Sequence, residues 1–425
     1  MNYKKTILEN GLRVITVPMK GNETTTVMVM VEAGSNYEQK ENNGVSHFLE
    51  HLCFKGTINR PSSKIINEEL DVLGTQSNAF TGEEYTGYWA KAHYTKTEKI
   101  LEIVSDLFLN PTIPAEEMEK EKGVIVEEIN MYEDMPISKV EEVFSSLMYG
   151  EQPPGRSVAG TKENIKRMTR EDIIKYRAQH YRSSATTVVV AGKISEKKVL
   201  AQIEKSFEKM LKGKPVKLGK VMEDQVNPAV KLFNKKTDQT HLVLGWRAFD
   251  RYNKKGVVLS LLSTILGGGM SSRLFQKMRE ELGVCYYVKS RNSASRTYGA
   301  FIIRAGVNNE RVAEAIDGIL TEVRKIVAEP VTEQELRKAK DYKIGNMFLG
   351  LESSDSWGDW FGFQELLHDK KIETPDELKA KIEAVTVKDI QKVAKEILRT
   401  GTLNLAMVGG FKEGDEKKYL ELLKV

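Results

Sequence analysis

Two kinds of apolar pattern alternate along this chain. Short segments of alternating character, rich in β-branched residues, predict strands, and longer segments with apolar residues every three to four positions predict helices. The clearest predicted strands are TTTVMVMVEA from Thr24, THLVLGWRAF from Thr240, TTVVVAG ending at Gly192 and LNLAMVG ending at Gly409. The pattern therefore indicates an α+β protein.

The same blocks occur twice, in the same order and at nearly one offset. The two apolar strands begin at an offset of 216 (240 − 24), and the two closing strands end at an offset of 217 (409 − 192). TREDIIKY from Thr169 resembles TVKDIQKV from Thr386 at an offset of 217, and EEMEKEK around Met118 resembles QELRKAK around Leu336 at 218. Four such agreements indicate a duplicated chain with two α+β domains.

The segment LKGKPVKLGKVMEDQVNP, from Leu211 to Pro228, separates the two copies. It is rich in Lys, Gly and Pro and has no apolar periodicity, which is typical of a linker. We therefore expect a first domain at residues 1–211, a linker at 212–228 and a second domain at 229–425.

Composition excludes several classes of protein. Of the 425 residues, 64 are basic and 60 acidic, and this nearly balanced charge of +4 argues against nucleic acid as a partner. The two cysteines, Cys53 and Cys285, belong to no paired motif, so we expect neither disulfides nor a thiolate zinc site. No segment has the character of a membrane span or of a leader peptide, so we expect a cytoplasmic protein without membrane association.

The segment NNGVSHFLEHLCFKGT carries the candidate chemistry. His47 and His51 are four residues apart, so on a helix both imidazoles lie on one face and can reach one ion. Glu50 lies close enough to a metal-bound water to act as general base without ligating the ion. H-x-x-E-H is the inverted zincin motif. The alternative is that one histidine packs in a core and the other caps a helix.

A short buried helix is predicted around these residues. Asn42 or Asn43 offers an N-cap and Gly56 a stop. The apolar surface that would bury the helix comes from Phe48, Leu49, Leu52 and Phe54.

Two imidazoles are too few for catalytic zinc, which usually has three protein ligands and a water. In PAEEMEKEKGVIVEEINMYEDM, helical periodicity places Glu128 on one face with Glu121, Val124 and Ile125. A carboxylate on an apolar face is costly unless it is paired or bound to a cation. Glu128 is therefore the favoured third ligand, and Glu127 remains the competing candidate.

The second copy offers no equivalent site. Adding 216 to the positions of the two histidines leads to Ser263 and Gly267, in the apolar segment GVVLSLLSTILGGG. One domain would then bind the ion, while the other shapes the cleft, binds substrate or is purely structural.

With these residues in place, the chain resembles the pitrilysin-type (inverted zincin, M16) peptidases, in the short branch that contains mitochondrial processing peptidase and its bacterial relatives. The resemblance covers nearly the whole chain through HFLEHLCFKGT, QSNAFTGEEYTGYWA, EKEKGVIVEE and GGGMSSRLFQKMREELGVCYYV. It implies the processing-peptidase/LuxS-like fold, in which two tandem homologous domains each have a mainly antiparallel sheet packed with helices. It also implies Zn²⁺, with Glu128 as third ligand and Glu121 as a supporting residue behind it.

The resemblance implies roles for residues outside the metal motif. Arg279 and Tyr286, seven residues apart, would contact the substrate and help to stabilise the oxyanion. Asn78, Ala79 and Phe80 would form an edge strand that pairs with the substrate backbone. Without the resemblance, these five residues would be a helix-surface arginine, a strand-core tyrosine and ordinary sheet.

The expected function is that of a zinc metalloendopeptidase, processing-peptidase-like, which hydrolyses peptide bonds in flexible peptides or unfolded presequences. The family also implies assembly as a homodimer or as a heterodimer with a related subunit. The alternative is a noncatalytic binding or assembly subunit of the same fold, and a hydrolase of non-peptide amides is a weaker option.

Overall fold

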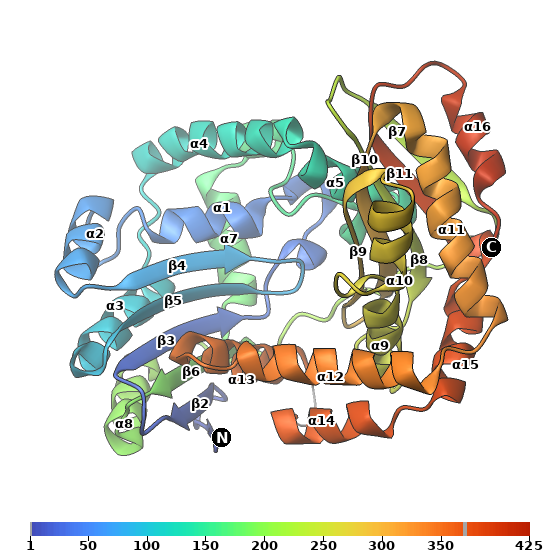
Figure 1. The fold of residues 1–425 in the computed structure, drawn as a ribbon. Helices are drawn as coiled ribbons and strands as arrows, with labels where there is room; N and C mark the ends of the chain where they lie inside the picture. The colour runs from blue at the N-terminus through green and yellow to red at the C-terminus, as the bar shows by residue number, and fades with distance from the viewer. Residues whose placement is uncertain (1, 369–371) are drawn as a thin grey trace. The chain divides into compact units, whose positions relative to one another are not determined.

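The computed structural model describes residues 2–368 and 372–425, and its contacts divide the chain into two compact units (Figure 1). The first unit consists of Met1–Ile129, Ser157–Leu218 and Leu349–Thr374, and the second of Asn130–Arg156, Gly219–Phe348 and Pro375–Val425. Residues 211–228 form neither helix nor strand. The boundaries expected at 1–211 and 229–425 describe the two copies of the repeat, which is a different division of the chain, and they stay a prediction.

The first unit contains a six-stranded sheet in the order β1-β2-β6-β3-β5-β4. β2 and β6 are parallel, and every other neighbouring pair is antiparallel. In sheet order the strands are β1 (Lys4–Ile7), β2 (Arg13–Pro18), β6 (Thr186–Gly192), β3 (Thr24–Val31), β5 (Thr86–His93) and β4 (Gln76–Thr81).

The second unit contains a five-stranded sheet in the order β7-β11-β8-β10-β9, with β7 and β11 as its parallel pair. The other pairs are antiparallel. Apart from β1, the two sheets have the same order and place the parallel pair alike, which confirms two homologous α+β domains with mainly antiparallel sheets. The strands are β7 (Ala229–Asn234), β11 (Leu403–Gly409), β8 (Thr240–Ala248), β10 (Gly299–Val307) and β9 (Cys285–Ala294).

The central strands are apolar on both faces because both faces are covered. In β3, Val27 and Val29 face the main core of the first unit, whereas Met28 and Met30 face a separate apolar cluster. The continuous run of buried residues in β3 thus reflects two cores, one on each side of the sheet.

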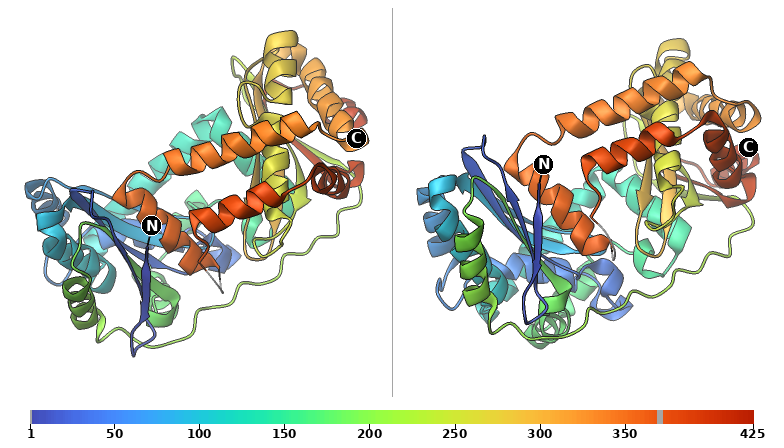
Figure 2. Two further views of the ribbon diagram at one scale, coloured as in Figure 1. Left: turned by 60° about the horizontal axis from the view of Figure 1, so that its bottom comes forward. Right: turned by 90° about the horizontal axis from the view of Figure 1, so that it is seen from below.

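The helix that covers the second face of each sheet comes from the other copy of the repeat. α13 (Ser354–Leu367) packs against β3 and β6 of the first sheet (Figure 2). α5 (Pro136–Tyr149) packs against β11 and β8 of the second sheet. The two helices begin at an offset of 218 (354 − 136), which agrees with the offset of the repeat. They are therefore equivalent helices that the two copies exchange.

Each copy of the repeat contains further helices before, between or after its strands. In the first copy they are α1 (Val45–Cys53), α2 (Ser63–Val72), α3 (Thr97–Leu109), α4 (Ala115–Asp134), α6 (Lys162–Arg167), α7 (Arg170–His180) and α8 (Glu196–Phe207). In the second they are α9 (Gly256–Gly267), α10 (Arg273–Phe275), which continues as a π-helical turn over Gln276–Glu281, α11 (Val312–Ala328), α12 (Glu333–Leu349), α14 (Pro375–Ala384), α15 (Val387–Ile397) and α16 (Asp415–Leu422).

The repeat extends to individual hydrogen bonds. α7 begins with a capping box between Thr169 and Asp172, and α15 begins with the same box between Thr386 and Asp389. In each box the threonine hydroxyl lies 2.7 Å from the aspartate oxygen. The paired blocks seen in the sequence are thus equivalent helix starts.

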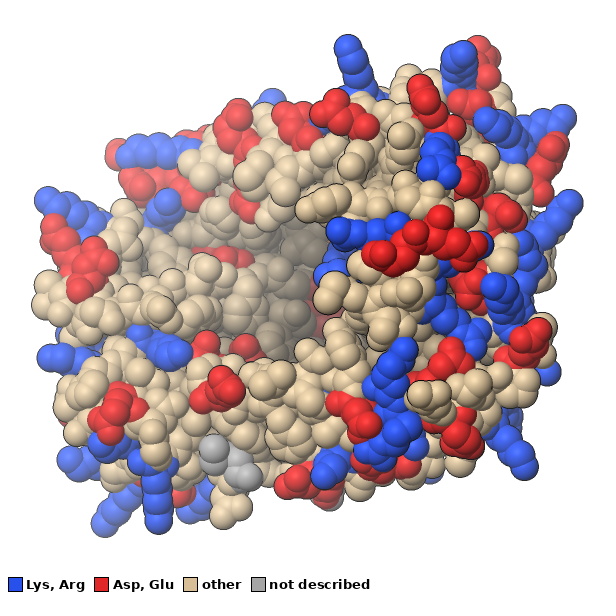
Figure 3. Space-filling view, in the orientation of Figure 1, with Lys and Arg blue, Asp and Glu red and all other residues tan. Residues whose placement is uncertain are grey.

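The surface carries charges of both signs. Acidic and basic side chains are interspersed over the face shown in Figure 3, and some pair locally, as Lys64 does with Glu68 one helical turn away. Among the described residues, no helix combines the length and the apolar character that crossing a membrane requires.

Candidate metal site

The helix α1 carries both histidines of the motif and Glu50. Its buried residues include Phe48, Leu49 and Leu52, whose helical spacing fixes α1 against the main core of the first unit. The helix ends at Cys53, before the predicted stop at Gly56. The other, polar face of α1 carries His47, Glu50 and His51.

The predicted N-cap of α1 was wrong, because a carboxylate from farther upstream performs the capping. The N-cap position is Gly44, in the left-handed region at φ 101°. The buried carboxylate of Glu38 accepts hydrogen bonds from the backbone N–H groups of Gly44 and Ser46 and from the side-chain amide of Asn43, each at 2.8 Å. An anion at this end also suits the helix dipole.

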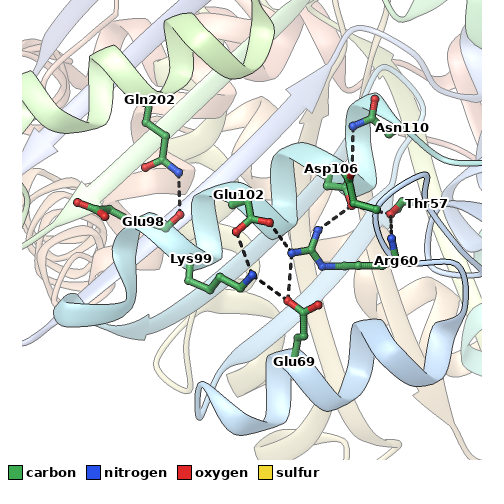
Figure 4. A network of polar contacts seen from close by, with 10 residues as sticks. Thr57, Arg60, Glu69, Glu98, Lys99, Glu102, Asp106, Asn110 and Gln202 are labelled. Atoms are coloured by element: carbon green, nitrogen blue, oxygen red, sulfur yellow. Dashed lines mark hydrogen bonds and ion pairs between the residues drawn. The ribbon is translucent and has the colours of Figure 1, made fainter.

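The loop that follows α1 is fixed by a buried arginine (Figure 4). The guanidinium of Arg60, 2% exposed, lies 2.7 Å from Asp106, 2.7 Å from Glu102 and 3.0 Å from Glu69. Asp106 also accepts a hydrogen bond from Thr57 at 2.5 Å. The exit of the histidine helix is therefore tied to α2 and α3.

Three side chains converge as a candidate metal site, and Glu128, from α4, is the third of them. Nε2 of His47 lies 3.2 Å from Nε2 of His51, and the Glu128 carboxylate lies 3.6 Å from the first nitrogen and 3.4 Å from the second. Two ligands held at about 2.0 to 2.1 Å from a tetrahedral zinc ion are separated by about 3.3 Å. The three residues therefore fit such an ion, and Glu127, which is exposed, is not part of the group.

Glu121 orients one of the two imidazoles. Its Oε1 lies 2.8 Å from Nδ1 of His51, and its Oε2 lies 2.6 Å from Nζ of Lys55. When Nδ1–H donates to the carboxylate, the lone pair of Nε2 is directed at the space shared with Glu128. Glu121 is buried, its role as a supporting residue stays a prediction, and the contact of Lys55 was not foreseen.

The two histidines have opposite pKa shifts. Burial, together with the neighbouring His51, lowers the pKa of His47 to about 4. Burial also disfavours the charged form of His51, but hydrogen bonds to Glu121 and Glu128 outweigh it and raise the pKa of His51 to about 9. A cation that binds here must therefore displace a proton from His51.

Glu50 lies beside the ligands without joining them. Its Oε2 accepts a hydrogen bond from the hydroxyl of Thr81 at 2.5 Å. Burial raises the pKa of Glu50, and the hydrogen bond from Thr81 opposes this shift. A carboxylate with a raised pKa is suited to accept a proton near neutral pH.

Asn78, Ala79 and Phe80 lie in β4, at the edge of the first sheet. β4 pairs with β5 on one side, and within residues 2–368 and 372–425 no strand pairs with its other side. Asn78 is exposed, whereas Phe80 packs against Phe363, with ring centroids 5.6 Å apart. An edge of this kind can accept a further strand.

Arg279 and Tyr286 belong to the second unit and contact each other. Nη1 of Arg279 donates to the backbone oxygen of Tyr286 at 2.9 Å, and the guanidinium lies 5.3 Å from the centroid of the Tyr286 ring. Tyr286 is 71% exposed, so it is not the strand-core tyrosine that the sequence without the family resemblance suggests. The pair offers a cation and a phenol to solvent.

The positions in the second copy that correspond to the histidines lie in α9, where Ser263 and Gly267 are buried. In the part of the chain that the structure describes, His47, His51 and Glu128 are the one group of three or more His, Cys, Asp or Glu residues that could hold a metal ion.

Comparisons with known proteins agree with this fold and site. Residues 13–162 match the family described as Insulinase (Peptidase family M16), and residues 167–342 match the Peptidase M16 inactive domain. An uncharacterized zinc protease of Streptomyces coelicolor is 32% identical over 96% of this chain and 90% of its own length. One of Bacillus subtilis is 32% identical over 93% of this chain and 95% of its own.

Solved structures share the fold. A protease from Helicobacter pylori superposes with a TM-score of 0.90 at 24% identity, covering 96% of this chain and 99% of that one. A peptidase M16 inactive domain from Pseudomonas fluorescens superposes with a TM-score of 0.87 at 18% identity, covering 97% and 99%.

The fold and the His-His-Glu group define a two-domain metallopeptidase of the H-x-x-E-H type. The chain belongs to the insulinase (peptidase M16) family, which confirms the family expected from its motifs.

Proposed function

We propose that this chain is a zinc metalloendopeptidase that cleaves flexible peptides or unfolded presequences, in the manner of a processing peptidase. The observation that carries the proposal is the convergence of two imidazole nitrogens and one carboxylate within 4.8 Å of one another. The carboxylate of Glu50 lies close enough to interact electrostatically with His51 and Glu128. A mixed nitrogen and oxygen ligand set suits zinc, and a catalytic zinc site keeps a position open for water.

The chain's own residues divide the chemistry between them. When bound, zinc would lower the pKa of a water toward about 7 and polarise the scissile carbonyl. Glu50 takes a proton from the attacking water and later returns it to the leaving amine. Glu121 keeps the proton of His51 on Nδ1, so that Nε2 remains available as a ligand.

Substrate binding would use the free edge of β4. A peptide that adds to Asn78, Ala79 and Phe80 as a further strand is held by its backbone, which favours extended and flexible substrates over folded proteins. Arg279 and Tyr286, exposed on the second unit, would contact the substrate and help to stabilise the oxyanion.

The setting of the enzyme belongs to the same proposal. Relatives named as zinc proteases support peptides as substrates. A cytoplasmic location and assembly as a homodimer, or with a related subunit, are further predictions. Size-exclusion chromatography with light scattering tests the assembly.

Replacing Glu50 by Gln tests the assignment of the base. The variant should keep stoichiometric zinc, because Glu50 is outside the ligand group, and should lose peptidase activity by a factor of about 10² or more. Activity is measured on a quenched fluorogenic peptide pool, with and without chelator, and the products are mapped by mass spectrometry. Glu127→Gln, on the exposed side of α4, is the matched control and should remain active.

Two results would contradict the proposal in different ways. Full activity in Glu50→Gln would remove Glu50 as the base while leaving the metal assignment intact. Purified wild-type protein that binds no zinc, or cleaves peptides equally well in excess chelator, would remove the zinc peptidase function itself.

A further inference from the structure

We propose that Thr81 is a positioning residue for the reaction: its hydroxyl holds the Glu50 carboxylate in the orientation from which that carboxylate accepts a proton. The inference rests on the proposed function, in which Glu50 is the base. It assigns a role to Thr81, which comes directly after Asn78, Ala79 and Phe80 and lies outside the H-x-x-E-H motif.

The hydrogen bond leaves the two oxygens of Glu50 unequal. Thr81 Oγ1 donates to Oε2 at 2.5 Å. No other hydrogen bond or ion pair to this carboxylate occurs among residues 2–368 and 372–425. One oxygen is therefore anchored, and Oε1 is free to take a proton from water. An unanchored glutamate would have to lose this freedom at the moment of reaction, which costs rate.

The strand determines the direction of the threonine hydroxyl. Side chains alternate along β4, so Thr81 and Ala79 share one face and Phe80 takes the other. Ala79 packs against the core that contains α1, whereas Phe80 packs against Phe363 of α13. Thr81 therefore faces the helix that carries Glu50. Its branched β-carbon restricts rotation about χ1, which keeps the hydroxyl in place.

The position of Thr81 also connects base and substrate. It is the last residue of β4, immediately after the Asn78 to Phe80 edge to which a peptide would add. The strand that holds the substrate backbone thus also holds the base. This arrangement fixes the distance between the two without a mobile intermediary.

The test compares isosteric and conservative replacements in the full-length, zinc-loaded protein. Thr81→Val removes the donor but keeps the shape, and should lower kcat about tenfold with KM and zinc affinity unchanged. Thr81→Ser should recover most of the loss. Thr86→Val is the matched control, because buried Thr86 pairs with Thr81 across the strands and donates instead to the Ala33 carbonyl at 2.9 Å. It should destabilise the fold without lowering kcat.

A second measurement does not depend on activity. In the metal-free chain, Thr81→Val should lower the unfolding midpoint less in a Glu50→Ala background than in the wild type, because the bond is already lost. Additive shifts of the unfolding midpoint would overturn the inference. A Thr81→Val variant with wild-type kcat, or a Thr81→Ser variant as impaired as Thr81→Val, would also overturn it. So would a loss of zinc that accompanies the loss of kcat. A wild type without chelator-sensitive activity would instead overturn the proposed function.

Discussion

Oε1 of Glu121 lies 2.8 Å from Nδ1 of His51, and Oε2 of the same carboxylate lies 2.6 Å from Nζ of Lys55. The ring of His51 is thereby oriented by a buried hydrogen bond that does not involve the cation. Partners of this kind raise the basicity of a ligating imidazole and reduce the freedom it must lose on binding. The candidate metal site is therefore preorganised by the protein.

Replacing Glu121 by Gln should weaken zinc binding by a factor of about 10 to 100. The amide keeps the size of the side chain but loses the charge that His51 and Lys55 share. Zinc affinity is measured by competition with a chromophoric chelator. Glu119→Gln, at a residue of the same helix that pairs with Lys122 at 2.8 Å, is the control and should bind zinc as the wild type does. Equal affinity in both variants would show that Glu121 does not support the site.

Zinc affinity should rise with pH. The pKa of His51 is raised to about 9 and that of His47 is lowered to about 4, so between these values His51 must lose one proton to become a ligand, whereas His47 is already neutral. The apparent dissociation constant should fall about tenfold per pH unit between roughly pH 6 and 8. Calorimetric titrations in buffers of different ionisation enthalpy measure the released proton. A flat profile would mean that His51 binds no proton in the metal-free protein.

Replacing Asp106 by Ala should destabilise the first unit by about 3 kcal/mol, because Arg60 would keep a buried charge without its most buried partner. Asp106 is 3% exposed and lies 2.7 Å from the arginine (Figure 4). Glu102→Ala is the control, since Glu102 is 50% exposed and its removal should cost less than about 1 kcal/mol. Both values come from denaturant unfolding of the metal-free chain. Similar costs would show that burial does not decide the strength of these pairs.

His180 should make the fold less stable as pH falls. Burial lowers its pKa from 6.5 to about 4, and the ring stacks on Tyr176 with centroids 4.2 Å apart. The folded state therefore keeps His180 neutral while the unfolded state takes up a proton. Its contribution is complete above about pH 6.5 and is lost as pH falls toward 4, by up to about 3 kcal/mol.

His180→Phe keeps the stacking and removes the titration, so the stability difference between wild type and variant should shift by that amount between pH 7 and pH 4. The measurement is unfolding in excess chelator, which removes the pH dependence of zinc binding. A constant difference for His180→Phe would place its proton affinity near that of the unfolded chain.

Local spacing allowed much of the site to be predicted. His47 and His51 share a helix face by periodicity alone, and a carboxylate on the apolar face of a second helix had to be paired or ligating, which favoured Glu128. The repeat predicted two similar sheets because strands and helix starts recur at one offset. The roles of Arg279, Tyr286 and the β4 edge came from family resemblance and stay predictions.

Contacts between distant segments could not be predicted. Glu38 caps α1 across a loop, Thr81 reaches Glu50 from another element, and Lys55 meets Glu121 only once α1 and α4 are packed together. The apolar pattern of β3 shows that both faces are buried, yet it does not say which helix covers the second face. That choice depends on tertiary packing, and the helix that covers it, α13, belongs to the other copy of the repeat, far along the chain from β3.

The exchange of α5 and α13 bears on the ancestry of the chain. A single copy of the repeat, folded alone, would have one face of its sheet uncovered. Two identical copies could cover these faces if each packed its helix against the sheet of the other. Such reciprocal exchange is what defines a domain-swapped homodimer. In the present chain one polypeptide supplies both helices, so proteolysis within residues 211–228 should leave two fragments that stay associated and that refold only together.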